Sequence, residues 1–329
     1  MNKYFKQFPV IKSLLQSYHK ICNYYVSGQP ESQIVLHNYG KIVYQDLWLS
    51  RFIENKGLLK NKPKIKISIF SVFGSRLMMR LDRSDVKIFF ARENVHRSAW
   101  KEYDDLCIPA HYIDLSIGFD NIIESGYLRF PLWIMWLFPP SINKEDIIQF
   151  YNKVNSPNNS SFYDRKFCSL IWSHYDVGRD ELFKDISTIG HIDSDGRYMH
   201  NNDDLRDKYN DDKLRYLTKY RFNLCPENSD VEGYCTEKIF EAIYSGCIPI
   251  YNGSCNNPEP EILNHNAICF VEMGKNEAGK LDEIRELNEN VSRYKDYASQ
   301  PRLCPMFTDV VLEYLNNLET SLKNIIDNL

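Results

Sequence analysis

One stretch decides the predicted fold of the second half of the chain: residues 220–253, with the sequence YRFNLCPENSDVEGYCTEKIFEAIYSGCIPIYNG. Two short apolar runs, at residues 222–225 and 248–251, suit buried strands. Between them, Thr236 stands where a helix N-cap belongs, and Gly246 stands where a C-cap belongs. The order strand, loop, helix, strand predicts a βαβ element, whose loops and helix N-terminus are natural sites for anions.

The start of the predicted helix carries two charged residues, Glu237 and Lys238. Backbone N–H groups at a helix start attract phosphate, and Lys238 would add a positive charge beside them. Glu237 would repel a phosphate, so its carboxylate is better suited to accept hydrogen bonds from sugar hydroxyls. Both residues could instead be ordinary first-turn residues on a solvated face, and the spacing alone favours that simpler interpretation.

Outside this stretch, the chain alternates apolar runs with helical patterns, which predicts mostly parallel sheets. At 329 residues it is long for one core, so two domains are expected. The Asn/Ser/Pro-rich residues 155–161 are the best candidate for a boundary or long loop. The predicted strands cover residues 33–36, 64–73, 86–90, 112–117 and 167–172, and the predicted helices cover 43–60, 75–83, 179–186 and 307–329.

Composition excludes several classes of protein. The apolar fraction of 43% and charged fraction of 26% are typical of a globular chain. A net charge of −4 argues against a nucleic-acid partner, which would usually require a basic excess. The nine cysteines include no pair of Cys-x-x-Cys units, so zinc is not expected, and a reduced, cytoplasmic protein is the better interpretation.

The N-terminal residues 1–26 lack the uninterrupted apolar core of a signal peptide. After Pro9, apolar residues recur on one face of a predicted helix, and lysines are the only charged side chains before Glu31. This pattern fits a basic helix that makes peripheral contact with the inner face of a membrane. The alternative, a helix packed on its own domain, is the commoner use of such a pattern.

Two further residues are candidates for chemistry. Glu93 follows the apolar run 86–90, and a carboxylate at the carboxyl end of a parallel strand can serve as a general base. It could equally be a loop glutamate paired to Arg92 or Arg97. Arg179 could clamp a diphosphate with two parallel hydrogen bonds, although a surface salt bridge is the simpler role.

A pair of acids, Asp193 and Asp195, invites a metal-dependent interpretation, because two carboxylates could hold a divalent cation bound to a diphosphate. The residue that follows is Gly196, and Asp, Ser and Gly are common in turns. We therefore favour a turn at residues 193–196, with no metal site.

The long motif resembles a known signature. Residues 222–228, 233–238 and 246–253 are similar to the donor-binding signature of the alpha-1,3/4-fucosyltransferases, glycosyltransferase family 10. Residues 91–94, 114–120 and 127–131 resemble further segments of that family. The resemblance covers residues 64–260 well and the two ends poorly. Pro226 departs from it, since the family usually has an aromatic residue at this position.

The resemblance implies a GT-B fold, which is an α/β architecture of two Rossmann-like domains facing a cleft. Residues 1–150 would form the acceptor-binding domain, residues 151–305 the GDP-fucose-binding domain, and residues 306–329 a C-terminal helix. The protein would be a bacterial-type catalytic domain acting in glycan synthesis, on Lewis-antigen or lipopolysaccharide structures.

The family resemblance also implies an activity. Fucose would move from GDP-fucose, with inversion, to O3 of N-acetylglucosamine (or glucose) in a lactosamine- or lactose-type acceptor. A metal cofactor would not be strictly required, although a divalent cation could stimulate. The alternatives are a metal-dependent glycosyltransferase of other specificity and a non-catalytic nucleotide-sugar-binding homologue.

The resemblance also implies roles for individual residues. Glu93 matches the general base, and Arg179 and Lys238 match groups that neutralise the diphosphate. Asn228, Tyr234 and Glu237 match further donor contacts beside the helix start at Thr236.

Overall fold

The computed structural model describes residues 18, 26–27, 32–38, 47–107, 111–157, 163–173, 177–272 and 278–329. The helix predicted over residues 1–26 falls almost wholly outside this part of the chain, so its contact with a membrane stays a prediction. Within the described ranges, no helix combines the length and apolar character needed to cross a bilayer.

The chain divides into two compact units. Unit 1 comprises residues 1–130, 139–141 and 314–329, and unit 2 comprises residues 131–138 and 142–313. Helix α5 (Lys144–Val154), which the predicted limit at residue 150 would cut, belongs wholly to unit 2. The C-terminal helix α12 (Phe307–Asp327) contributes its first residues to unit 2 and the rest to unit 1.

Unit 1 is built on a six-stranded sheet in which the strands follow one another in chain order. From β2 to β6 the neighbours pair in parallel, whereas β1 pairs antiparallel with β2. The central strands read as continuous apolar runs because both faces of a parallel sheet are covered. The elements are β1 (Val26–Ser27), β2 (Ile34–His37), α2 (Trp48–Asn55), β3 (Ile67–Phe70), α3 (Arg76–Leu81), β4 (Val86–Phe90), η3 (Lys101–Cys107), β5 (Leu115–Gly118) and β6 (Tyr127–Arg129).

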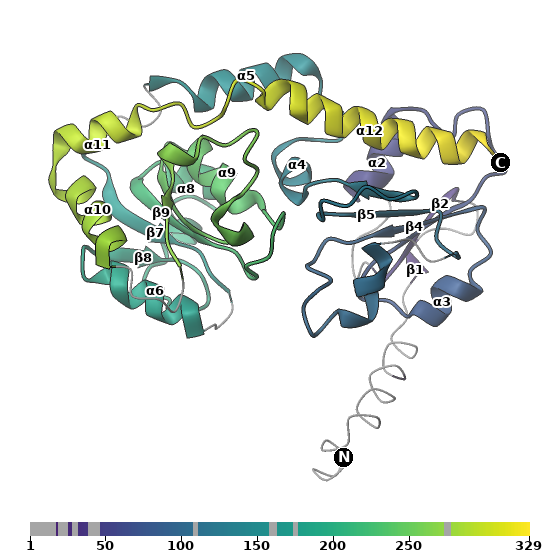
Figure 1. Cartoon of the computed structure of the whole chain (residues 1–329), viewed down its shortest axis with the longest axis horizontal. Coiled ribbons are helices and arrows are strands. Elements are labelled where there is room, and N and C mark those ends of the chain that lie inside the picture. The colour runs from purple at the N-terminus through teal and green to yellow at the C-terminus, as the bar shows by residue number, and fades with distance from the viewer. Residues whose placement is uncertain are drawn as a thin grey trace, which may run out of the picture. The chain divides into compact units, whose positions relative to one another are not determined.

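Unit 2 contains a second, fully parallel sheet with the strand order β11-β10-β9-β7-β8 (Figure 1). This order confirms the βαβ element predicted from residues 220–253, because β9 and β10 are parallel neighbours joined through α9. The elements are α4 (Leu132–Leu137), α5, β7 (Lys166–Leu170), α6 (Val177–Ser187), β8 (Ile192–Ser194), α7 (Asp204–Asp207), α8 (Lys213–Leu217), β9 (Tyr220–Pro226), α9 (Glu237–Tyr244), β10 (Ile248–Asn252), η5 (Ser254–Asn256), η6 (His265–Ala267), β11 (Cys269–Phe270), α10 (Ala278–Glu289) and α11 (Val291–Ala298).

Alternation along β9 explains how helices cover both faces of the sheet of unit 2. Phe222 and Leu224 pack into a core that also contains Leu182 of α6, Leu287 of α10 and Tyr294 of α11. Cys225, which follows Leu224, points to the opposite face, where its thiol lies 3.6 Å from the carbonyl oxygen of Lys238 in α9. Because successive side chains of a strand point to opposite faces, one strand serves both layers.

Two sequence interpretations were wrong. The turn expected at Asp193 is instead strand β8, which pairs in parallel with β7. Turn propensity is overridden here because the Asp193 carboxylate accepts hydrogen bonds from Lys166 and Tyr220, both at 2.7 Å. The second concerns the C-terminal helix, whose apolar spacing predicts that Ile325 and Leu329 pack inward; Ile326 is the buried residue instead, and Leu329 is 65% exposed, so the packing face of α12 is offset by one residue at its end.

A buried histidine at the end of β2 makes the stability of unit 1 sensitive to pH. Nε2 of His37 lies 3.0 Å from the Ser68 hydroxyl and 3.6 Å from the Asp82 carboxylate. Burial lowers the pKa of His37 to about 4, and the charge of Asp82 opposes that shift only in part. The folded state therefore holds this ring neutral, while the unfolded chain binds a proton near the ordinary value of 6.5.

We expect the free energy of unfolding to fall as the pH drops from about 6.5 towards 4, because protons then bind preferentially to the unfolded state. Between pH 7 and 5 the contribution of His37 should reach about 2 kcal/mol. Denaturant titrations at several pH values will measure it. His37→Asn should flatten the slope relative to the exposed control His111→Asn, and equal slopes in both variants would disprove the assignment.

Candidate functional site

The candidate site of unit 2 lies at the carboxyl ends of β9 and β10, where α9 begins. Glu227 follows the last residue of β9, and its backbone N–H donates to the carbonyl of Asn252 at the end of β10, at 2.8 Å. In parallel α/β sheets this edge, together with the adjoining helix N-termini, is where ligands bind.

The centre of this site is the carboxylate of Glu227, whose side chain is fully buried. It accepts hydrogen bonds from the backbone N–H of Thr236 at 2.7 Å, from the Thr236 hydroxyl, and from the ammonium of Lys238 at 2.6 Å. We call these three residues the Glu227 cluster. A buried charge is tolerated only when it is paired and hydrogen-bonded, and this one is.

Thr236 occupies the N-cap position that the sequence predicts, but it does not cap the helix with its side chain. Its hydroxyl donates to Glu227 and accepts a hydrogen bond from Lys238 at 2.6 Å. The side chain that would ordinarily satisfy a first-turn N–H is therefore drawn to the carboxylate. The N–H groups at the start of α9 keep their capacity to bind an anion.

Lys238 is held as a cation. Burial alone would lower its pKa, but the negative charges of Glu227 and Glu237 outweigh that effect and raise the pKa above its ordinary value. Its side chain is 24% exposed although the ammonium bonds to the buried carboxylate of Glu227, so part of Lys238 lies at the surface of the site. Glu237 is half-buried beside it, at the first position of α9.

Arg179, from α6, is buried, whereas the simpler role considered for it was at the surface. Its Nη2 donates to the carbonyl oxygen of Glu227 at 2.8 Å, and its guanidinium carbon lies 5.3 Å from the centre of the Trp172 ring. Arg179 therefore adds positive charge next to the Glu227 cluster and fixes the backbone that presents the carboxylate.

The remaining predicted donor residues differ in their surroundings. Tyr234 is buried, whereas Asn228, directly after Glu227, is exposed. Glu227 itself was not among the predicted site residues, although the motif contains it. The available signal was its position, since an acid that directly follows a buried strand lies at the ligand edge of the sheet.

The structure gives a physical account of Pro226. The last β7–β9 pair joins Ser169 and Asn223, three residues before Pro226. Successive N–H groups of a strand point to opposite sides, and the Glu227 N–H points to β10. The nitrogen of Pro226 therefore faces the side where pairing with β7 has ended, so proline forfeits no hydrogen bond of the sheet.

Glu93 belongs to unit 1 and stands three residues after the end of β4, half-buried at the carboxyl edge of that sheet. The N–H of Ala91 donates to the carbonyl of Ile117 at 2.9 Å, so the chain stays tied to β5 just before Glu93. This is the position that the sequence predicts, and the role of Glu93 as a base stays a prediction.

The carboxylates of the metal-dependent interpretation are engaged within unit 2. Asp193 is bound by Lys166 and Tyr220, which lower its pKa although burial raises it. Asp195 accepts the backbone N–H of Leu205 at 2.7 Å and the hydroxyl of Tyr216. In the part of the chain that the structure describes, no three His, Cys, Asp or Glu side chains are arranged to hold a metal ion.

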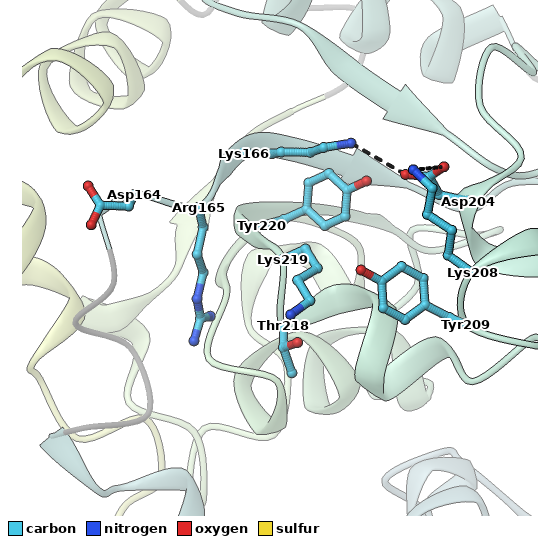
Figure 2. A pocket seen from close by; sticks show the side chains of 9 residues that line it. All are labelled: Asp164, Arg165, Lys166, Asp204, Lys208, Tyr209, Thr218, Lys219 and Tyr220. Carbon is cyan, nitrogen blue, oxygen red and sulfur yellow. Dashed lines mark ion pairs between the residues drawn. The ribbon is translucent and has the colours of Figure 1, made fainter.

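A cavity of about 670 Å³ lies at the other edge of the same sheet (Figure 2). It is bordered by Lys166 and Tyr220, the first residues of β7 and β9, so it is at the amino ends of the strands. Two of its four lining cations, Lys166 and Lys208, pair with Asp204, at 3.7 and 2.8 Å. This cavity is distinct from the Glu227 cluster and is not at the ligand edge of the sheet.

Unit 2 belongs to the class of doubly wound parallel α/β folds, and it gathers the start of α9, a lysine and an arginine at the carboxyl ends of its strands, the edge at which ligands of such folds bind. Two family models then match the chain: "Glycosyltransferase family 10 (fucosyltransferase) C-term" over residues 164–302, and "Alpha-(1,3)-fucosyltransferase FucT N-terminal domain" over residues 40–136. The chain belongs to glycosyltransferase family 10, as the motif predicts.

Curated relatives agree with this family. Alpha-(1,3)-fucosyltransferase B of Drosophila melanogaster is 29% identical over 185 residues, which are 53% of this chain and 40% of the relative. Alpha-(1,3)-fucosyltransferase FucT of Helicobacter pylori is 28% identical over 209 residues, which are 56% of this chain and 42% of the relative. The matched parts thus span about two fifths of these relatives.

Solved structures confirm the predicted GT-B fold class. A crystal structure of an alpha1,3-fucosyltransferase superposes with a TM-score of 0.52 and 21% identity, and covers 77% of each chain. A structure described as alpha1,3-fucosyltransferase with GDP gives a TM-score of 0.50 over 79% of each chain, also at 21% identity.

Gly253 provides a test of the Glu227 cluster. Its φ is +147°, and a Cβ built on it would lie 2.6 Å from Cγ and 2.8 Å from Cβ of Glu227. Because Glu227 is held by several hydrogen bonds, it cannot move aside without losing them. We expect Gly253→Ala to destabilise unit 2 by about 1–3 kcal/mol, measured by denaturant unfolding.

The matched control is Gly279→Ala, since no atom lies within 4 Å of a Cβ placed on Gly279 in helix α10. That variant should be neutral or slightly stabilising, as alanine favours a helix. If the two variants unfold alike, the packing of Gly253 against Glu227 does not constrain the site.

Proposed function

We propose that this chain is an inverting fucosyltransferase, which moves fucose from GDP-fucose to O3 of N-acetylglucosamine (or glucose) in a lactosamine- or lactose-type acceptor. The observation that carries the proposal is the Glu227 cluster at the start of α9, which holds a lysine cation beside first-turn N–H groups that the Thr236 side chain does not cap. Membership of family 10 and the names of the relatives support the choice of fucose, and the solved structure of an alpha1,3-fucosyltransferase with GDP supports the choice of GDP.

In this proposal the diphosphate binds at the start of α9. Its oxygens accept hydrogen bonds from first-turn N–H groups and face the ammonium of Lys238. Arg179 adds charge from within the unit, and Asn228, Tyr234 and Glu237 contact the rest of the donor. The negative charge that grows on the leaving GDP is met by groups already in place, which is the condition for electrostatic catalysis.

Transfer then proceeds as one in-line displacement. The acceptor hydroxyl oxygen attacks C1 of fucose, the bond from C1 to the diphosphate breaks, and Glu93 takes the hydroxyl proton. Attack on the face opposite the leaving group inverts the configuration at C1, by the logic of inverting glycosidases. The step does not strictly require a metal, although a divalent cation could stimulate it by shielding the diphosphate.

Product analysis tests the proposal as a whole. Incubation with GDP-fucose and N-acetyllactosamine should give a fucosylated trisaccharide whose NMR spectrum shows an α-linkage to O3. Activity should persist in a metal chelator. A chain that binds GDP but forms no product would be a non-catalytic homologue, and complete loss of activity in chelator would favour the metal-dependent alternative.

The general base is tested by Glu93→Gln, which keeps the size of the side chain but removes its basicity. We expect the turnover number to fall by about 10²–10⁴, because a well-placed base contributes about that factor. GDP binding, measured by calorimetry, should not change. The control is Glu124→Gln, at an exposed glutamate of the same unit. Near-normal turnover in Glu93→Gln would show that Glu93 is not the base.

The diphosphate site is tested by Lys238→Ala. Loss of a charge-assisted contact should weaken GDP binding by about 10- to 100-fold in calorimetry. The control is Lys213→Ala, which breaks the ion pair between Lys213 and Glu241. Glu241 lies on α9, the helix that also carries Lys238. An unchanged GDP affinity in a folded Lys238→Ala protein would place the diphosphate elsewhere.

A further inference from the structure

The segment that carries Glu93 is fastened by a histidine that the proposed chemistry does not use. His96 bonds through Nδ1 to the carboxylate of Asp104 and through Nε2 to the carboxylate of Asp120, the latter at 2.6 Å. Its ring also stands edge-on to Phe119, with the centroids 5.7 Å apart. Both ring nitrogens are thus committed to carboxylates.

These contacts join three parts of unit 1. His96 belongs to residues 91–97, which we call the Glu93 segment and which follow β4; Asp104 lies in η3, and Asp120 lies just after β5. Asp120 is itself fixed, because its backbone N–H donates to the hydroxyl of Tyr127 on β6 at 2.9 Å. One ring therefore ties the Glu93 segment to both neighbouring elements.

The chain between Glu93 and this ring has little freedom. Asn94 is buried, its side-chain oxygen accepts the backbone N–H of His96 at 2.9 Å, and its carbonyl accepts the N–H of Arg97 at 3.3 Å. Glu93 directly precedes this turn, so a displacement of His96 would be transmitted to the carboxylate. A catalytic base must be held to within fractions of an ångström, which makes such a displacement costly for turnover.

The two contacts require the ring to be positively charged. A neutral imidazole has one N–H, so one nitrogen would direct a lone pair at a carboxylate, whereas imidazolium donates from both. Burial lowers the pKa of His96, but the hydrogen bonds and charges of Asp120 and Asp104 outweigh burial and raise the pKa above its ordinary value.

The charged groups that face the ring are Asp104 from η3 and Asp120 from the loop after β5, with the Tyr127 hydroxyl 3.5 Å from the other oxygen of Asp120. Asp105, the next acid on η3, pairs instead with Arg76, with Nη2 and Oδ2 2.9 Å apart. Asp105 is therefore a matched control, as it is an ion-paired carboxylate of the same element without contact to His96.

We propose that His96, held as an imidazolium between Asp104 and Asp120, is a positioning residue that keeps the Glu93 segment in its working conformation. The inference rests on the proposed function, in which Glu93 is the base. As the pH rises and the ring loses its proton, one attraction becomes a repulsion and the segment loosens. Turnover should then fall, whereas the KM for GDP-fucose, which unit 2 binds, should stay constant.

The experiment compares pH profiles of turnover in the wild-type protein and in Asp120→Asn, Asp104→Asn and Asp105→Asn. Removing a carboxylate that touches the ring should move the alkaline decline to lower pH by about one unit, which is about a tenfold loss on the alkaline side. Asp105→Asn should leave the decline in place. His96→Lys, which keeps a cation with several donors, should remain active at a pH where the wild-type protein has declined.

Other results would overturn the role. If Asp120→Asn and Asp104→Asn reduce turnover equally at every pH, the contacts are merely structural. If the wild-type profile is flat through the ionisation of His96, seen by NMR of the ring, the segment does not depend on that proton. Circular dichroism and denaturant unfolding confirm that unit 1 of each variant is folded, because GDP binding would report only on unit 2.

The contacts of His96 with Asp104 and Asp120, which we call the His96 clamp, can also be tested without turnover. If the wild-type protein transfers no fucose, the proposed function fails, and the NMR titration of His96 still decides whether the clamp exists. A lower pKa of His96 in Asp120→Asn supports the clamp, and an unshifted titration overturns it.

Discussion

The buried carboxylate of Glu227 is the constraint on which the site of unit 2 depends. Taking a carboxylate out of water costs several kcal/mol unless donors replace the lost hydration, so this side chain is stable only where several donors converge. Those donors come from Thr236 and Lys238, at and just after the start of α9. Hydrogen bonds and an ion pair, in addition to packing, thereby fix the end of β9 to the start of α9.

Other features of the site follow from that carboxylate. Gly253 leaves room for its side chain, and Arg179 holds its backbone carbonyl. The lysine that would bind an anion is kept charged by the same group, because the attraction to Glu227 exceeds the cost of burial. One negative charge inside the unit therefore positions positive charge at its edge.

The sequence was sufficient for the elements whose signals are local. The strands around residues 86–90 and 222–225 and the helix that starts after Thr236 could be predicted because apolar periodicity and helix-end residues specify them. Strand β8 could not, since Asp193 becomes acceptable in a strand only through Lys166 and Tyr220, which are distant in sequence. The role of Glu227 could not be predicted for the same reason. A carboxylate at a strand end can be exposed to solvent or buried, and the residues that bind Glu227 are known only from the structure.

Cavity size is a poor guide to chemistry in unit 2. The cavity at the amino ends of β7 and β9 is roomy, but Lys166 and Lys208 there are already matched by acids of the same unit. At the carboxyl ends of the strands, α9 begins with first-turn N–H groups that the Thr236 side chain does not cap, and Glu227 holds Lys238 beside them. Backbone donors at a helix start attract anions, so this edge, rather than the cavity, is the better candidate for an anion site.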